Sequence, residues 1–288
     1  MQQDMHVRCN VTRNIVRGAA VALTSIVFVT SAAAQSPLLK NVALCNGEDH
    51  TSAEPQIAGC TALIELRVGN PQTQAITYNN RGNAYAGKGE YELAIKDYGD
   101  SIKLDPNYAK AFNNRGVAYQ KKGDYDRAIK DFDAAINITP DYANAFANRA
   151  ATYDKKGNHG RALKDFDEAI RLQPTVGNLW NERCWSRAVI GELQAALADC
   201  NEAIRLQPNL AATFDSRGFT YLKLGQWELA IADYDAALRL DPKLASALYG
   251  RGFAKVKRGD LAGGNTDITA AKTAEQNIVG EFARYGVH

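Results

Sequence analysis

The stretch AKAFNNRGVAYQKKGDYDRAIKDFDAAINITPDY, from Ala109 to Tyr142, predicts two amphipathic helices with one short break between them. Two aromatic residues and a glycine, spaced four and three positions apart, mark one face of the first helix: Phe112, Gly116 and Tyr119. The second helix has a stripe of the same kind: Ala128, Phe132 and Ala135. Gly123 can adopt the left-handed conformation that ends a helix, and Pro140 stops the second helix. Neither helix can bury its stripe alone, so the pair needs neighbours.

The neighbours are copies of this stretch. Prolines recur every 34 residues: Pro106, Pro140, Pro174, Pro208 and Pro242. Units counted from Ala75, Ala109, Ala143, Gly177, Ala211 and Ala245 have a large residue at position 4 and a small one at positions 8 and 20. In period and pattern the chain resembles the tetratricopeptide repeat family over about two thirds of its length.

The resemblance implies an all-α fold, a right-handed α-solenoid of stacked antiparallel helix pairs in which each unit touches only its neighbours. We expect four segments: a signal peptide (1–34), an N-terminal cap with a disulfide (35–74), five repeats (75–244), and a degenerate sixth repeat with a C-terminal capping helix (245–288). The sixth unit has Gln276 in place of the terminal proline.

The first 34 residues have the features of a secretory signal peptide. Three arginines precede an apolar run from Gly18 to Val29, and three alanines precede Gln35. The alternative is an N-terminal membrane anchor, for which the run is short. We expect cleavage between Ala34 and Gln35 and export to the periplasm or beyond. Cleavage leaves 31 basic and 31 acidic residues. This neutral chain offers no basic surface for nucleic acid and no segment for membrane insertion.

Four cysteines remain after cleavage, and they allow three pairings: Cys45, Cys60, Cys184 and Cys200. Repeat geometry favours Cys184 with Cys200, because positions 8 and 24 face each other across one hairpin. Cys45 and Cys60 have nearly the same separation, and IAGCTALIEL around Cys60 is similar to LADCNEAIRL around Cys200. A metal site or a redox pair is the alternative to two structural disulfides. Both would normally use a CxxC motif, which the chain lacks.

Arginine stands at position 7 of all six units: Arg81, Arg115, Arg149, Arg183, Arg217 and Arg251. Aspartate stands at position 23 of all six: Asp97, Asp131, Asp165, Asp199, Asp233 and Asp267. Arginine can bind a carboxylate through two parallel hydrogen bonds. We therefore expect a ladder of Arg–Asp pairs, within or between units, that sets the register of the helices. The alternative is a row of arginines for anionic ligands, which the aspartates would neutralise.

In this family the first helices line a concave groove, and the resemblance implies ligand contacts from positions 2, 5, 9 and 12. The candidate groove residues are Asn79, Asn83, Lys110, Asn113, Gln120, Asn144, Asn178, Asn181, Trp185, Asp215, Phe219, Tyr249 and Phe253. Amides predominate at one end and aromatic rings at the other. The alternative for Trp185 and Phe219 is packing between neighbouring units. The family's carboxylate clamp is absent, because Asn79 stands where that clamp has lysine.

No set of residues typical of catalysis emerges beyond the repeat pattern, and we predict no enzyme activity, metal or cofactor. We expect a non-enzymatic scaffold or adaptor of the cell envelope that binds a protein or an extended peptide in the groove. The alternatives are a structural protein that binds cell-wall glycan and a regulatory subunit of an envelope enzyme. The sequence does not identify the partner or the oligomeric state.

Overall fold

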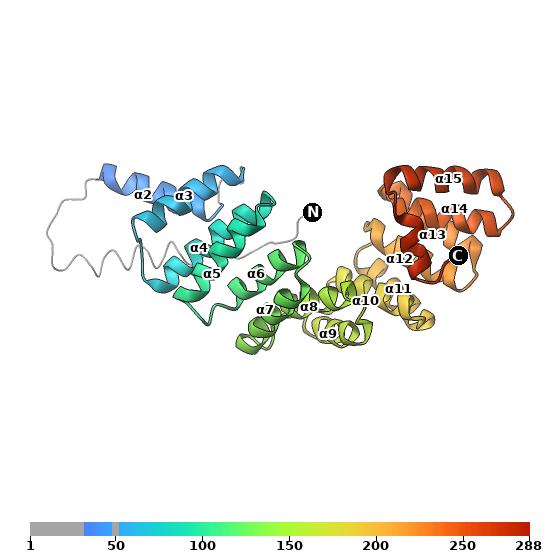
Figure 1. The fold of residues 1–288 in the computed structure, drawn as a ribbon, viewed down its shortest axis with the longest axis horizontal. Helices are drawn as coiled ribbons and strands as arrows, with labels where there is room; N and C mark the ends of the chain where they lie inside the picture. Colours follow the sequence, from blue (N-terminus) through green and yellow to red (C-terminus); the bar gives the residue numbers. More distant parts are fainter. Residues whose placement is uncertain (1–31, 48–51) are drawn as a thin grey trace. The chain divides into compact units, whose positions relative to one another are not determined.

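The computed structural model describes residues 32–47 and 52–288, and these residues form fifteen helices and no strand (Figure 1). The all-α class and the stacking of consecutive helix pairs predicted from the sequence are confirmed. Most of the expected signal peptide, residues 1–31, lies outside the described part of the chain. Within the described part, no helix is both long enough and apolar enough to cross a bilayer.

The chain divides into two compact units, and the boundary in the sequence falls between Pro140 and Asp141. The helices of the first unit are α2 (Ala32–Cys45), α3 (Ala53–Glu65), α4 (Pro71–Gly87), α5 (Tyr91–Leu104), α6 (Ala109–Lys121) and α7 (Tyr125–Ile138). Those of the second are α8 (Ala143–Lys155), α9 (His159–Leu172), α10 (Gly177–Ile190), α11 (Leu193–Leu206), α12 (Ala211–Lys223), α13 (Trp227–Leu240), α14 (Ala245–Lys257), α15 (Leu261–Ala274) and α16 (Ile278–Arg284).

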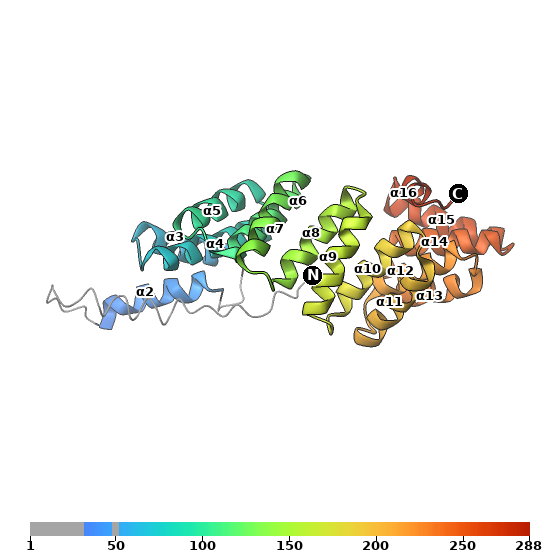
Figure 2. The same ribbon diagram turned by 90° about the horizontal axis from the view of Figure 1, so that it is seen from below.

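Helices pack in consecutive pairs, and within each unit a pair also packs against the next one (Figure 2). A short turn with a left-handed glycine joins the two helices of a pair, as at Gly123 with a φ of 80° and Gly191 with a φ of 90°. In the second unit, the even-numbered helices α10, α12 and α14 lie side by side. Equivalent positions of successive repeats therefore line up in rows along these first helices.

The core of a pair depends on a small residue at position 8. In the second repeat, a Cβ atom added to Gly116 would lie 2.6 Å from the ring of Phe132, so the glycine lets the ring lie directly on the helix backbone. The first and fifth repeats have the same contact, between Gly82 and Tyr98 and between Gly218 and Tyr234. Alanine lines the rest of each interface, which allows two helices to approach closely.

The N-terminal pair α2 and α3 precedes the first full repeat. A disulfide joins Cys45 to Cys60, with a Cα–Cα distance of 4.6 Å. The next helix begins at Pro71, four residues before the unit boundary counted from the repeat pattern. The cause is local: the Asn70 side chain accepts a hydrogen bond from the Thr73 amide at 2.8 Å, and proline at the first helical position needs no donor partner.

Candidate functional site

Every repeat contains one Arg–Asp pair with two parallel hydrogen bonds. In the second repeat, Arg115 Nε lies 2.8 Å from Asp131 Oδ2 and Nη2 lies 2.8 Å from Oδ1. All six pairs join residues 16 apart in the sequence, so each links the two helices of one repeat. The aspartate is buried in each pair, and its hydrogen bonds raise the pKa of the Arg115 guanidinium. The geometry is that of a structural ladder.

The remaining guanidinium nitrogen of several ladder arginines, Nη1, donates a hydrogen bond to the preceding helix pair. Nη1 of Arg183 donates to Asp167 at 2.7 Å, and Nη1 of Arg251 donates to Asp235 at 2.8 Å. Arg217 and Arg81 reach back in the same way, to Asn201 and Thr61. At the equivalent place opposite Arg115 stands Gly99, and a Cβ atom added to this glycine would lie 3.7 Å from Nη1. The ladder is thus formed within repeats and extended between them.

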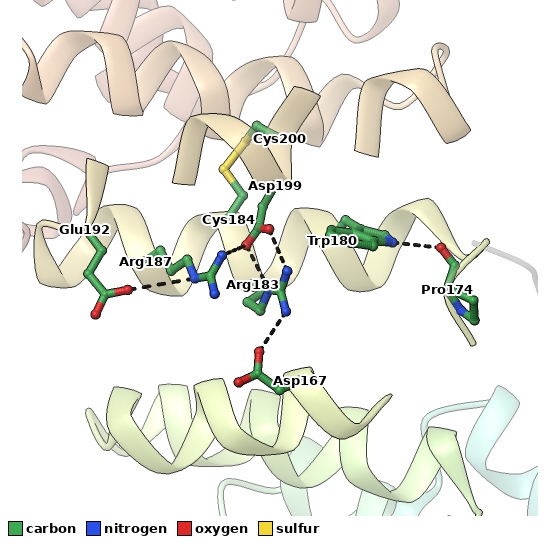
Figure 3. A network of polar contacts seen from close by, with 9 residues as sticks. All are labelled: Asp167, Pro174, Trp180, Arg183, Cys184, Arg187, Glu192, Asp199 and Cys200. Carbon is green, nitrogen blue, oxygen red and sulfur yellow. Dashed lines mark hydrogen bonds and ion pairs between the residues drawn. A yellow bond between two sulfur atoms is a disulfide. The ribbon is translucent and has the colours of Figure 1, made fainter. Parts of the chain in front are cut away.

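The fourth repeat contains a network of polar contacts around Asp199 (Figure 3). Asp199 accepts hydrogen bonds from Arg183 and, at 2.7 Å, from Arg187 Nη1. Arg187 replaces the tyrosine found at position 11 of most repeats. The disulfide between Cys184 and Cys200, with a Cα–Cα distance of 5.4 Å, replaces the contact between glycine and an aromatic ring. A covalent bond and a second arginine hold this hairpin where ring packing is missing.

In the first unit, the predicted groove amides Asn79 and Asn83 form hydrogen bonds with residues outside the predicted set. Asn114 Nδ2 donates to Asn79 and Asn83 at 3.0 Å each, and the Tyr98 hydroxyl donates to Asn83 at 2.8 Å. Asn79 and Asn113 are buried and Asn83 is exposed, while Lys110 and Gln120 are half-buried. Asn79 and Asn83 of the first repeat thus use their amide oxygens in hydrogen bonds to the second repeat.

In the second unit, Asn144 and Asn178 are exposed, whereas the aromatic residues are covered. The Trp185 and Phe219 rings contact each other with centroids 4.9 Å apart, and Phe253 is half-buried. The first-helix face is the name used below for one row on α10, α12 and α14: Asn181, Trp185, Asp215, Phe219 and Tyr249.

The last helix of the chain lies on this face. The ring of Tyr285 lies 5.2 Å from that of Trp185, and the ring of Phe282 lies 5.8 Å from that of Phe219 and 4.6 Å from that of Tyr249. The C-terminal segment covers more than the final hairpin, because Tyr285, just after the end of α16, contacts Trp185 on α10. Trp185 and Phe219 therefore pack between repeats and under α16, and are not open anchors of a groove.

Carboxyl groups lie beside the aromatic cluster. Asp154 on α8 accepts hydrogen bonds from Ser186 and, at 2.9 Å, from His159. Burial raises the pKa of Asp154 despite these two bonds, and it also raises the pKa of Glu182 on α10. The negative charge of Asp154 raises the pKa of Glu182 further. The two carboxyls therefore ionise less readily than exposed ones.

In the fifth repeat, burial has a larger effect on the pKa of Asp215. Burial raises the pKa of Asp215 to about 7, and one hydrogen bond, from Ser246 at 2.8 Å, opposes the rise. Its Oδ1 atom and the Oδ1 atom of Asn181 are inaccessible and accept no hydrogen bond from any described residue. The first-helix face thus holds two acceptors that lack donors.

Comparison of equivalent positions could have found the residues that sequence reasoning missed. Position 6 is asparagine in the first three repeats, and Glu182 is the first departure from it. Asp154 stands at position 12 of the third repeat, one of the positions implied for ligand contact, but the sequence does not show the burial that raises its pKa. Around these residues and throughout the described ranges, no group of three or more His, Cys, Asp or Glu side chains could hold a metal ion.

Comparison with known proteins agrees with the repeat pattern. A family model described as "TPR repeat" matches residues 82–123 and 220–259, and one described as "Tetratricopeptide repeat" matches residues 109–142 and 143–176. No curated protein sequence matches the chain.

Three solved structures illustrate the shared fold. A tetratricopeptide repeat protein of Parabacteroides merdae is 17% identical, with a TM-score of 0.69 over 87% of this chain and 99% of its own. PilF of Pseudomonas aeruginosa is 16% identical, with a TM-score of 0.62 over 73% of this chain and 96% of its own. YrrB, described as a TPR protein with an unusual peptide-binding site, is 24% identical, with a TM-score of 0.53 over 66% and 96%. At these identities the likeness extends to the fold alone. The repeated helix pairs and the matching family models show that this chain belongs to the tetratricopeptide repeat family.

Proposed function

We propose that this protein is an exported scaffold that binds a segment of another protein along its first helices. Tetratricopeptide repeats support a role in protein–protein interaction. The observation that carries the proposal is the docking of α16: side chains from three successive first helices together hold one helical segment of the chain itself. A surface that binds such a segment in the same molecule has the shape and apolar character to bind one from a partner.

The cysteines support an oxidising compartment. Both disulfides lie inside helical hairpins, and disulfides persist in secreted and periplasmic proteins but are rare in the cytosol. Together with the signal-like residues 1–34, they favour the cell envelope as the place of action. A fusion of residues 1–50 to alkaline phosphatase, an enzyme that is active only after export, tests this part. An inactive fusion would contradict export.

The binding surface can be mapped by photocrosslinking in intact cells. A photoreactive amino acid placed at Asn144 or Asn178, which are exposed on first helices, should crosslink to the same partner protein. The matched control is Leu229, which is 49% exposed on the second helix α13 and should give no such product. Equal crosslinking from both kinds of helix would contradict binding along the first helices.

A further inference from the structure

The C-terminal segment occupies the first-helix face with one side only. Ile278, Phe282 and Val287 are each at most 5% exposed, and Tyr285 contacts Trp185. Val279, on the other side of α16, is 39% exposed. Residues 278, 282 and 285 follow the spacing i, i+4, i+7, which places them on one face of a helix. The face therefore accommodates an amphipathic helix with three apolar side chains at that spacing.

The helix that occupies the face is intrinsically weak. It has only seven residues, contains Gly280, and has no side-chain hydrogen bond at its N-terminus. Isolated helices of this length do not form in water, so packing on the face must hold α16 in its helical form. Three exposed residues, 275–277, connect it to α15. The segment also packs on α14 and α15, so its departure would expose part of the apolar surface of that helix pair.

The contact between α16 and the first-helix face is apolar and leaves polar atoms of the face without partners. Rings and aliphatic side chains make it, and in the described part of the chain no side-chain hydrogen bond joins α16 to α10, α12 or α14. Asn181 Oδ1 and Asp215 Oδ1, on the same row one turn before Trp185 and Phe219, receive no donor.

We propose that the first-helix face binds an amphipathic helix of a partner protein, with apolar side chains at i, i+4 and i+7, and that α16 is a removable occupant of the same site. This inference rests on the proposed scaffold function and specifies the partner's chemistry. Binding requires α16 to leave, so the partner's apparent affinity is reduced by the fraction of molecules in which α16 is docked. Changes that weaken α16 should strengthen binding.

Hydrogen exchange on the unmodified protein tests whether α16 can leave. If α16 undocks locally, its backbone amides should exchange on the order of 100-fold faster than those of α10 and α12. Exchange of α16 at the same slow rate as α10 would overturn the proposal, because the segment would then separate only when the whole unit unfolds.

Competition by the segment itself tests the chemistry of the site. The probe is a fluorescent synthetic peptide of residues 275–288, EQNIVGEFARYGVH, added to the full chain. A Phe282→Ala/Tyr285→Ala variant should bind it at least about tenfold more tightly than the wild-type chain, because α16 no longer competes well. The control variant Val279→Ala changes an exposed side chain of the same helix and should bind as the wild type does. A probe with alanine at 282 and 285 should not bind.

Equal binding by wild type and double variant, or no binding by a variant whose circular dichroism shows a folded chain, would overturn the proposal. If the double variant unfolds, Tyr285→Ala alone gives the same comparison, since Tyr285 lies beyond the end of α16 and is half-buried. The photocrosslinking test separates the two ideas. If crosslinks from Asn178 form but do not increase in the α16 variants, the scaffold function is supported. The proposal that α16 competes with a partner helix is then contradicted.

Discussion

Arg115 and Asp131 are joined by two hydrogen bonds of 2.8 Å each across the two helices of one repeat. The Asp131 side chain is only 8% exposed and that of Arg115 22% exposed, so water screens the pair poorly. Five further pairs repeat this geometry. Register between the helices of each hairpin therefore depends on a charged contact as well as on apolar packing.

Removing one charge of this pair should destabilise the protein clearly. Asp131→Asn keeps the shape of the side chain but leaves the Arg115 guanidinium without a counter-charge, and we expect a loss of about 2–3 kcal/mol. Asp100→Asn is the matched control, because Asp100 pairs with Lys103, whose side chain is 78% exposed. That change should cost under about 0.5 kcal/mol. Urea unfolding of the two variants measures both; equal losses would contradict a structural role for the ladder.

The disulfide of the fourth repeat should stabilise its own hairpin. Replacing Cys184 and Cys200 by alanine should cost on the order of 3 kcal/mol, since it frees a loop of 16 residues and leaves a hairpin without ring packing. In a repeat protein the effect should be local, so hydrogen exchange should accelerate most in α10 and α11. The equivalent change at Cys45 and Cys60 should act on α2 and α3. Thiol titration of the denatured, unreduced chain from Gln35 onward should find no free thiol.

Two helical glycines should respond to alanine with opposite sign. At Gly116 the added methyl would lie 2.6 Å from the Phe132 ring, and moving that ring should cost about 1–3 kcal/mol. At Gly160 nothing lies within 4 Å of the added Cβ. There alanine should stabilise by about 0.5–1 kcal/mol, because glycine is a poor helix former. Thermal melting of Gly116→Ala and Gly160→Ala checks both, and the same sign in both would contradict the packing described for position 8.

Sequence reasoning succeeded where interactions are local and repeated. The helix pairs, the glycine turns and the position of Arg115 opposite Asp131 all lie within one period, and six copies show the same pattern. It predicted a capping helix at the C-terminus but not the contact with α10, because Tyr285 contacts Trp185 one hundred residues earlier in the chain and no repeat of this contact in the sequence reveals it. For the same reason the sequence left two interpretations of Phe219 open, an anchor in the groove and packing between repeats. The ionisation of Asp215 depends on burial, which equivalent positions in the sequence do not show.

Asp215 should make stability depend on pH. Its pKa is raised to about 7 in the folded chain from an ordinary value of 3.8, so between these values the folded state holds a proton that the unfolded state has lost. The stability that this proton provides is fully present below about pH 4 and is lost as pH rises through 7. The loss amounts to about 4 kcal/mol at most, less where water reaches the carboxyl.

Asp215→Asn removes this ionisation while its amide oxygen can still accept the hydrogen bond from Ser246. The variant should melt near the wild-type temperature at pH 4 and well above it at pH 8. The reverse change, Asn181→Asp, places a carboxyl at the equivalent position of the fourth repeat, where the side chain is 5% exposed, and should add pH dependence of the same sign. Melting temperatures from pH 4 to 8 measure both variants. A parallel pH profile for wild type and Asp215→Asn would mean that this carboxyl is already ionised in the folded chain, and that the first-helix face carries a full negative charge between Phe219 and Ser246 at neutral pH.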